Sequence, residues 1–170
     1  MNTVYISIGS NVDPDHHITR GIGLLKERFG ELALSPVYRS TPVGFDGADF
    51  LNLVAGFTTG EDAPAVINAL SAIEAECGRT RDTPRFGPRT LDLDLLLFGN
   101  STLQCNGKTL PRKEILEYAF VLKPLADLAG ANRHPESGRT FAELWRDFND
   151  PRQKLELYDG GGELGNVGRK

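Results

Sequence analysis

One segment constrains the fold more than any other, running from Arg85 to Phe98 as Arg-Phe-Gly-Pro-Arg-Thr-Leu-Asp-Leu-Asp-Leu-Leu-Leu-Phe. Asp92 and Asp94 alternate there with leucines. A period of two predicts a β-strand whose successive side chains face opposite sides of a sheet. The two carboxylates then share one face, with Cα atoms about 6.5–7 Å apart, and the leucines point into a core.

This aspartate pair has an ordinary alternative explanation, because one-sided antiparallel strands often expose a polar residue at every second position. Three features favour a functional site instead. Aspartate is depleted in strands, yet both residues lie in the most apolar segment of the chain. The run Leu95–Phe98 is apolar on both faces, which predicts a central strand that is buried at that end. The preceding loop is rich in arginine, at Arg79, Arg81, Arg85 and Arg89.

The chemistry of these residues points to a metal and a phosphate. Two carboxylates on one face repel each other unless a cation lies between them, and Mg²⁺ prefers oxygen ligands of this kind. Neighbouring arginines suit a third component of negative charge, most simply a polyphosphate. The residues alone therefore predict a magnesium-dependent phosphate site at Asp92 and Asp94.

Composition excludes several other classes of protein. A length of 170 residues suits one compact domain, and a net charge of −4 argues against general nucleic-acid binding. The two cysteines, Cys77 and Cys105, lack the spacing of zinc ligands. No signal peptide and no membrane span is evident, so we expect a cytoplasmic protein.

Apolar periodicity and turn residues predict the order strand, helix, strand, strand, helix, strand. Helices are expected to begin at Asp13 and Asp62, with Pro14 directly after the first and Pro64 two residues after the second. This order predicts an α+β fold with a ferredoxin-like βαββαβ core, an antiparallel sheet with helices on one face. An appended C-terminal strand and short helices near 120–129 and 141–148 should follow. We expect one domain over 1–159 and a Gly-rich, mobile tail at 160–170.

The segment Gly78–Gly99, with its Arg-Thr-Leu-Asp-Leu-Asp signature, closely resembles the 6-hydroxymethyl-7,8-dihydropterin pyrophosphokinase family of folate biosynthesis. Four further landmarks agree in order and spacing, namely Ile8–Asn11, Tyr38–Gly44, Phe50–Asn52 and Phe120–Leu125. The resemblance spans roughly residues 3–130 and implies the same ferredoxin-like fold. It implies an enzyme that transfers pyrophosphate from ATP to the pterin hydroxyl, giving AMP and the pterin diphosphate.

The resemblance also implies roles for single residues. Asp92 and Asp94 would hold two Mg²⁺ ions and would form the catalytic set together with Arg81 and Arg89. The ATP-binding residues would be Glu74, Arg81, Arg85, Arg89, Leu95, Thr109 and Arg112. The pterin-binding residues would be Ser40, Thr41, Pro42, Val43, Phe50, Asn52, Phe86 and Phe120. Phe120 would stack on the pterin ring and Asn52 would hydrogen-bond its amide-like edge, although ordinary core burial is the commoner fate of phenylalanine.

Two positions depart from the family pattern. Arg112 stands where the family usually has histidine, and Tyr118 stands where it usually has arginine. A divergent paralogue that binds pterin or nucleotide with little transfer is therefore the alternative function. An Asp-x-Asp sugar transferase is a third possibility, but the chain is too short for the nucleotide-binding α/β domain that it would need. We expect small-molecule partners only, no nucleic acid and no membrane, and a monomer.

Overall fold

The computed structural model describes residues 1–41, 47–78 and 90–158. The predicted order of elements is confirmed through the aspartate-bearing strand, with one additional short strand, β2. In chain order the elements are β1 (Asn2–Ser10), α1 (Pro14–Phe29), β2 (Ala33–Leu34), β3 (Tyr38–Ser40), β4 (Phe50–Thr59), α2 (Ala63–Glu76), β5 (Asp92–Phe98), β6 (Leu103–Cys105), β7 (Lys108–Leu110), α3 (Glu114–Glu117), α4 (Ala119–Ala129), α5 (Phe141–Asp147) and β8 (Leu155–Leu157).

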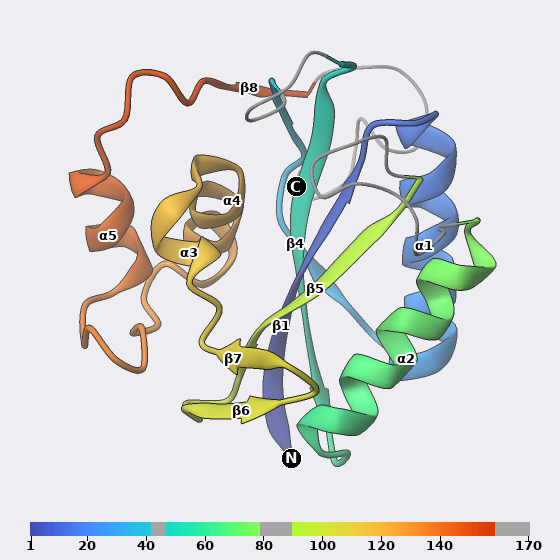
Figure 1. Cartoon of the computed structure of the whole chain (residues 1–170). Helices are drawn as coiled ribbons and strands as arrows, with labels where there is room; N and C mark the ends of the chain where they lie inside the picture. The colour runs from blue at the N-terminus through green and yellow to red at the C-terminus, as the bar shows by residue number, and fades with distance from the viewer. Residues whose placement is uncertain (42–46, 79–89, 159–170) are drawn as a thin grey trace.

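The main sheet is antiparallel, with strand order β5-β1-β4-β3-β8, and β2 also pairs with β4. The strands β6 and β7 form a separate hairpin. Figure 1 shows α1 and α2 on one side of the sheet and α3, α4 and α5 on the other. The two helices expected in the core, α1 and α2, therefore lie on one face as predicted, and the appended helices cover the other face.

Both sheet faces are apolar because both are covered by helices. Leu53 belongs to the core beneath α1 and α2, whereas its neighbour Val54 belongs to the core beneath α4 and α5. Both side chains are fully buried. Successive side chains of β4 thus point into the two cores in turn, so this 10-residue strand is apolar along almost its whole length.

The position of β5 corrects the prediction of a central strand. The sheet ends at β5, which pairs with β1. Its apolar faces reflect the two helix layers, and a register shift opposite Tyr5 and Ile6 lets the consecutive residues Leu96 and Leu97 enter the same core. Outer-edge backbone groups of β5 also have partners, because Glu74 accepts from Leu93 N–H at 2.8 Å and Arg112 N–H donates to Leu96 at 3.1 Å. These contacts protect an edge that would otherwise be open to another strand.

The predicted helix starts are confirmed in place, but only one is confirmed in its chemistry. Asp62 caps α2, since its carboxylate accepts from Ala65 N–H at 3.0 Å. Asp13 precedes Pro14 at the start of α1, yet its side chain forms no capping hydrogen bond. Its backbone instead adopts a left-handed conformation, with φ 43°. The turn geometry at Asp13, rather than a side-chain cap, therefore begins α1.

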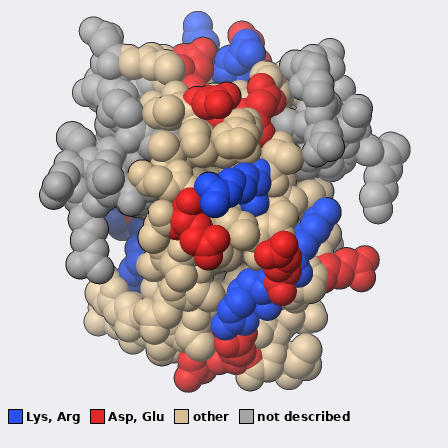
Figure 2. Space-filling model, turned by 90° about the vertical axis from the view of Figure 1, so that its right-hand side faces the viewer, with Lys and Arg blue, Asp and Glu red and all other residues tan. Residues whose placement is uncertain are grey.

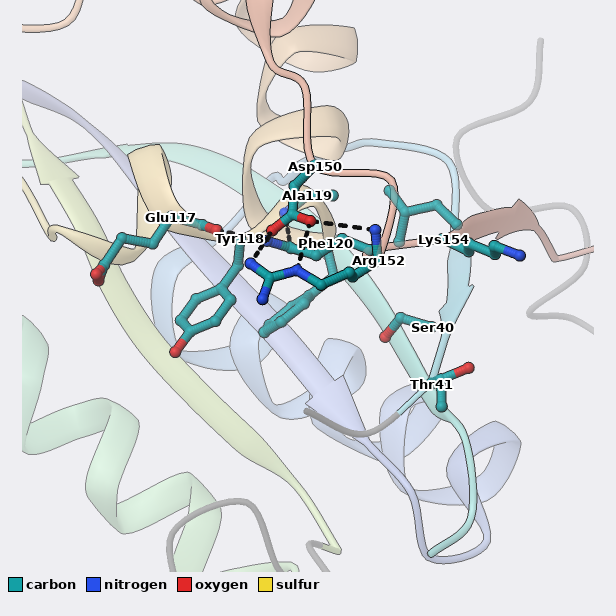
Figure 3. A pocket seen from close by; sticks show the side chains of 11 residues that line it. Ser40, Thr41, Glu117, Tyr118, Ala119, Phe120, Asp150, Arg152 and Lys154 are labelled. Carbon is teal, nitrogen blue, oxygen red and sulfur yellow. Dashed lines mark hydrogen bonds and ion pairs between the residues drawn. The ribbon is translucent and has the colours of Figure 1, made fainter. Parts of the chain in front are cut away.

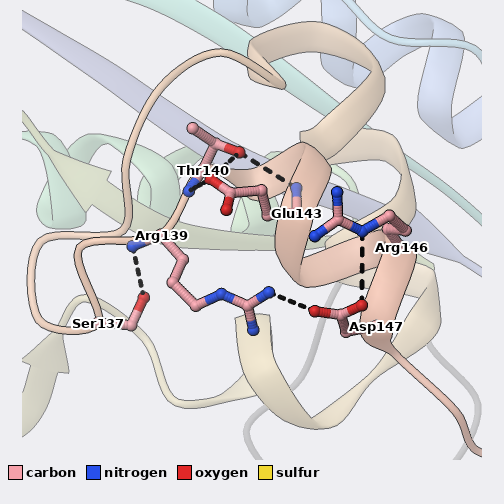
Figure 4. Close-up of polar contacts among 6 residues, drawn as sticks. All are labelled: Ser137, Arg139, Thr140, Glu143, Arg146 and Asp147. Carbon is pink, nitrogen blue, oxygen red and sulfur yellow. Dashed lines mark hydrogen bonds and ion pairs between the residues drawn. The ribbon is translucent and has the colours of Figure 1, made fainter.

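The helix α5 starts with a reciprocal cap (Figure 4). The Thr140 hydroxyl accepts from Glu143 N–H at 3.1 Å, and the Glu143 carboxylate accepts from Thr140 N–H at 3.1 Å. Arg139, just ahead of the helix, pairs with Asp147 at its end. These contacts hold a helix of only seven residues, which would be marginal by itself.

Thr140→Ala is expected to destabilise the protein by about 1 kcal/mol, which lowers the Tm of a domain of this size by about 2–4 °C. Hydrogen bonds from the Thr140 backbone and hydroxyl lower the pKa of Glu143 below its ordinary value of 4.5. Ionised Glu143 therefore contributes stability above pH 4.5 that is lost as the pH falls through the lowered pKa. The difference between variant and wild type should shrink over that range. Thermal melts against pH, with Thr140→Ser as the control, test this; a cost that does not change with pH would contradict it.

Figure 2 shows the side of the molecule that carries α1 and α2. Lysines and arginines are interspersed there with acidic residues. An ion pair joins α1 to the turn before α2, as Arg28 contacts Glu61 at 2.6 Å. Because positive and negative side chains are interspersed, the described part of this face has no continuous basic patch of the kind that binds nucleic acid. Among the described residues, no helix has the length and apolarity needed to cross a bilayer.

Candidate active site

The aspartate pair lies at the start of β5, as the alternation predicted. Asp92 and Asp94 are partly buried, whereas Leu93 between them is buried in the core beneath α1 and α2. Asp92 is paired with Gly9 of β1, and Asp94 with Ser7. The two carboxylates therefore share the sheet face opposite to that core.

A cation lies beside one of these carboxylates. Lys108, the first residue of β7, places its Nζ 3.7 Å from Asp94 Oδ1, and each side chain is about one third exposed. Its charge offsets part of the repulsion between the aspartates. Lys108 was not among the predicted site residues, because nothing in the sequence indicates that the β6–β7 hairpin folds back toward β5.

Two predicted nucleotide residues lie along the outer edge of β5. The Glu74 carboxylate, on α2, binds the backbone N–H of Leu93, so Glu74 approaches the strand between the two aspartates. Leu95 is 1% exposed, with its side chain in the core. A side-chain contact of Leu95 with a nucleotide is thus excluded, and only its backbone groups remain available at the strand edge.

The remaining described nucleotide residues gather at one cavity. Arg112 donates from Nε to Glu114 at 2.7 Å, and both side chains are mostly buried. This cavity has a volume of about 740 Å³, and Lys108, Thr109 and Lys113 line it together with Arg112. The predicted residues Thr109 and Arg112 therefore lie together, beside the lysine that contacts Asp94.

Three predicted pterin residues meet on β3 and β4. Ser40 is paired with Phe50, and Tyr38 is paired with Asn52. Asn52 is 7% exposed and donates from Nδ2 to Ser40 Oγ at 3.1 Å. The amide is thus fixed in a buried position by a hydrogen-bond partner, which a buried polar group needs.

A single row of paired residues connects this group to the aspartates. Asn52 lies opposite Gly9, and Gly9 lies opposite Asp92. Residues paired across strands project from the same face, so Asn52 and Asp92 flank Gly9 at a separation of about 10 Å, two strand spacings. A Cβ at Gly9 would lie 2.7 Å from Asn52 Oδ1. The lack of a side chain at Gly9 therefore gives the Asn52 amide oxygen room beside β1, and a glycine inside a strand was the signal that could have identified this position.

A second cavity, of about 460 Å³, opens beside Ser40 and Thr41 (Figure 3). Its other walls come from the beginning of α4, with Tyr118 and Phe120, and from the segment 150–155. The Tyr118 and Phe120 rings stack with centroids 5.1 Å apart. The volume suits a small molecule. Phe120 thus lies in the same cavity as Ser40 and Thr41, as predicted, whereas the contribution of segment 150–155 was not.

The sheet and α4 are tied together close to this cavity. The Tyr38 hydroxyl, on β3, donates to Asp127 of α4. Burial first, and then this bond, raises the pKa of Tyr38, so the hydroxyl stays protonated and remains a donor. Asp127 also pairs with Lys123 at 2.8 Å. These contacts fix the distance between the strand of Ser40 and the helix of Phe120.

Six predicted residues lie outside the described part of the chain, namely Pro42, Val43, Arg81, Arg85, Phe86 and Arg89. Within the described ranges, no group of three or more His, Cys, Asp or Glu residues comes together. Two neighbouring carboxylates nevertheless fit Mg²⁺, which commonly binds through one or two carboxylates plus phosphate oxygens of a substrate. The donor set present therefore fits a magnesium site that a polyphosphate completes.

Comparison with known proteins gives consistent relatives. The family model of 7,8-dihydro-6-hydroxymethylpterin-pyrophosphokinase matches residues 5–130. The chain is 44% identical over 149 residues to the 2-amino-4-hydroxy-6-hydroxymethyldihydropteridine pyrophosphokinase of Pseudomonas aeruginosa, covering 85% of this chain and 90% of the relative. It is 35% identical over 131 residues to the Bacillus subtilis protein of the same name, covering 75% and 78%.

Solved structures resemble the chain in fold. Wild-type HPPK-DHPS of Plasmodium falciparum superposes with a TM-score of 0.71 at 12% identity, covering 85% of this chain and 43% of that one. A second structure of that protein, with pteroate, gives a TM-score of 0.67 at 11% identity. This chain thus spans less than half the length of those proteins, and at such identity the likeness concerns the fold alone.

Proposed function

Because the chain belongs to the 7,8-dihydro-6-hydroxymethylpterin-pyrophosphokinase family, we propose that it transfers pyrophosphate from ATP to 6-hydroxymethyl-7,8-dihydropterin. The products are AMP and the pterin diphosphate. One observation carries this assignment to the site: Asn52, Gly9 and Asp92 are paired in one row on one sheet face. The row supports a pterin held at Asn52 whose hydroxymethyl group points toward the aspartates.

The pterin end of the site works by fixed contacts. Asn52 presents its amide, oriented by Ser40, to the amide-like edge of the ring. Phe120 offers its face for stacking, and the cavity that it shares with Ser40 and Thr41 holds the ring. A buried polar edge that finds no partner is costly, so a site of this kind rejects molecules that lack matching groups.

The phosphate end of the site works by charge. Asp92 and Asp94 would hold two Mg²⁺ ions, which would neutralise phosphate oxygens during the in-line transfer. Lys108 and Arg112, at the neighbouring cavity, add positive charge for the triphosphate. Arg81 and Arg89 complete the set, since an arginine stays charged and binds phosphate through two nitrogens.

The core has the ferredoxin-like βαββαβ arrangement. The elements β1, α1, β3, β4, α2 and β5 supply that pattern in chain order, and the sheet order β5-β1-β4-β3 supports it. In this arrangement β1 lies between β4 and β5, which is why Gly9 separates the pterin strand from the metal strand.

The assignment is tested by AMP release from ATP and Mg²⁺, with and without 6-hydroxymethyl-7,8-dihydropterin. Pterin-dependent AMP is the expected result. The alternative is a paralogue that binds without transfer; the observations in its favour are Tyr118 in place of a family arginine and the pairing of Arg112 with Glu114. No AMP, together with calorimetric binding of pterin or nucleotide, would establish that alternative.

Lys108→Met is expected to tighten Mg²⁺ binding in the absence of nucleotide by about two- to fivefold, the range of a partly exposed ion pair. The reason is that the Lys108 ammonium competes with the metal for Asp94 in the free protein. Titration calorimetry with MgCl₂ measures the change. Lys113→Met removes the same charge elsewhere in the same cavity and serves as the control. Equal changes in the two variants would mean that only net charge matters.

A further inference from the structure

The joint between α3 and α4 is unusually short. Tyr118 alone separates the two helices, in an extended conformation with φ −121° and ψ 126°. The first N–H groups of a helix need acceptors, and a side chain at the N-cap position normally supplies one. Tyr118 makes no such capping bond at α4. The start of the helix that carries Phe120 therefore depends on an acceptor from elsewhere.

Gln153 supplies that acceptor from the C-terminal part of the chain. Its Oε1 accepts from Ala119 N–H at 2.8 Å, and its Nε2 donates to the Glu117 carbonyl at 2.8 Å. One side chain thus binds the last residue of α3 and the first residue of α4. The Gln153 amide is itself held by Asp150, whose carboxylate accepts from Nε2 at 3.1 Å.

Asp150 is a centre of local contacts. Its carboxylate also accepts from Arg152 Nε at 3.0 Å and from Arg152 N–H at 3.1 Å. Hydrogen bonds from Arg152 first, and then from Gln153, keep the pKa of Asp150 well below its ordinary value, so the acceptor is ionised at neutral pH. Figure 3 shows Asp150 and Arg152 beside Tyr118 and Phe120 at one side of the cavity.

The same segment is fixed to the opposite wall of the cavity. Leu155 of β8 is paired with Ser40 of β3. Three residues later, Tyr158 N–H donates to the Val37 carbonyl at 2.9 Å, and the Tyr158 hydroxyl donates to Asp15 at 2.8 Å. Residues 150–158 therefore connect the strand of Ser40 to the helix of Phe120.

We infer that Gln153 is a positioning residue for the pterin pocket, which holds the start of α4 so that Phe120 faces Ser40 and Thr41. This inference rests on the proposed function, and it concerns a segment beyond residues 5–130, the part that the family model matches. Gln153 acts through the backbone of Glu117 and Ala119 and does not contact the ring itself. Its effect should appear in pterin affinity far more than in ATP affinity, because Ala119 begins the helix of Phe120, whereas the described ATP residues Glu74, Leu95 and Thr109 lie on α2, β5 and β7.

Gln153→Met tests the inference, since methionine keeps the approximate shape of the side chain and removes its hydrogen bonds to Ala119, Glu117 and Asp150. The expected result is a Kd for pterin, measured by calorimetry, that rises about tenfold, while the Kd for MgATP changes less than twofold. A tenfold loss corresponds to about 1.4 kcal/mol, the scale of an unmade hydrogen bond. The amide hydrogen of Ala119 should also exchange faster with solvent, as measured by NMR. This measurement tests the hydrogen bond between Ala119 and Gln153 without any ligand.

Two further variants sharpen the test. Glu156→Gln changes an exposed residue of the same segment and should leave both affinities unchanged. Gln153→Asn keeps the amide but shortens the side chain by one methylene, so it weakens the contacts with Ala119 N–H and the Glu117 carbonyl without adding charge beside Asp150. Its pterin affinity should fall between that of the wild type and that of Gln153→Met. This variant carries the test if Gln153→Met does not fold.

The outcomes separate the inference from the proposed function. If the wild-type protein binds pterin and both Gln153 variants bind it with the same affinity, the inference is wrong while the proposed function stands. Equal losses for pterin and ATP would also overturn it, because they would indicate a general loss of structure. Absence of pterin binding by the wild-type protein would overturn the proposed function and the inference with it.

Discussion

Asp94→Asn is expected to abolish pterin-dependent AMP release while the protein stays folded with a similar Tm. The loss should be on the order of a thousandfold, because metal-borne charge neutralisation contributes several kcal/mol to such a transfer. An amide keeps the size of the side chain but removes the negative charge that holds Mg²⁺. Asp92→Asn should behave in the same way, since both carboxylates lie on the same face of β5.

The stability part of this prediction follows from the surroundings of Asp94. Its ion pair with Lys108 is 3.7 Å long and about one third exposed, so losing it should change the free energy of unfolding by less than about 1 kcal/mol. Relief of repulsion from Asp92 offsets part of that loss. A Tm close to that of the wild type is therefore expected.

Activity and thermal melts of Asp94→Asn should be compared with those of Glu31→Gln, which makes the same chemical change at an exposed position after α1. Retention of more than a tenth of wild-type turnover by Asp94→Asn would exclude Asp94 as an essential metal ligand. A fall in Tm of more than about 5 °C, which for a domain of this size exceeds 1 kcal/mol, would mean that Asp94 is structural.

Gly9→Ala is expected to weaken pterin binding by about 10- to 100-fold. The new Cβ would lie 2.7 Å from Asn52 Oδ1, closer than real Cβ atoms approach such groups, so the amide must move. Displacing a buried polar group from its partners costs about 1–3 kcal/mol, and each 1.4 kcal/mol is a tenfold change. Calorimetry with pterin measures the effect directly.

Gly23→Ala is the matched control, because no atom lies within 4 Å of a Cβ at that position of α1. It should leave pterin binding unchanged and raise the stability slightly, since alanine favours a helix over glycine by about 0.5–1 kcal/mol. Asn52→Ala and the double variant complete a cycle. If Gly9→Ala acts through Asn52, the double variant should bind pterin no worse than the weaker single variant. Additive losses would mean that Gly9 acts independently of Asn52.

Local patterns predicted much of the architecture and part of the site. Alternation at 91–98 correctly placed Asp92 and Asp94 on one face, because the side-chain period of a strand depends only on the backbone. The caps and prolines correctly located the starts of α1 and α2. Asn52 was named through the family resemblance, and in the structure its buried amide has a partner in Ser40.

The error in placing β5 has one cause. An apolar sequence pattern predicts that a residue is buried, but it does not reveal which element covers it. The run Leu95–Phe98 indicated a strand apolar on both faces, and a central strand was the simplest explanation. Instead β5 lies at the sheet edge, with helices on both faces and with Glu74 and Arg112 along its outer edge. The side chain of Leu95 lies in the core, so the predicted contact of Leu95 with the nucleotide would have to be made through its backbone.

By itself, the sequence determined the strand period that pairs the aspartates, the order of the core elements and the family to which the chain belongs. These follow from backbone geometry and from short motifs, each of which is contained in a few consecutive residues. Only the tertiary structure decided that Gly9 separates Asn52 from Asp92, that Lys108 contacts Asp94, and that Gln153 holds the helix of Phe120. Each of these contacts joins residues far apart in the chain, and the packing of whole elements, rather than any local preference, brings them together.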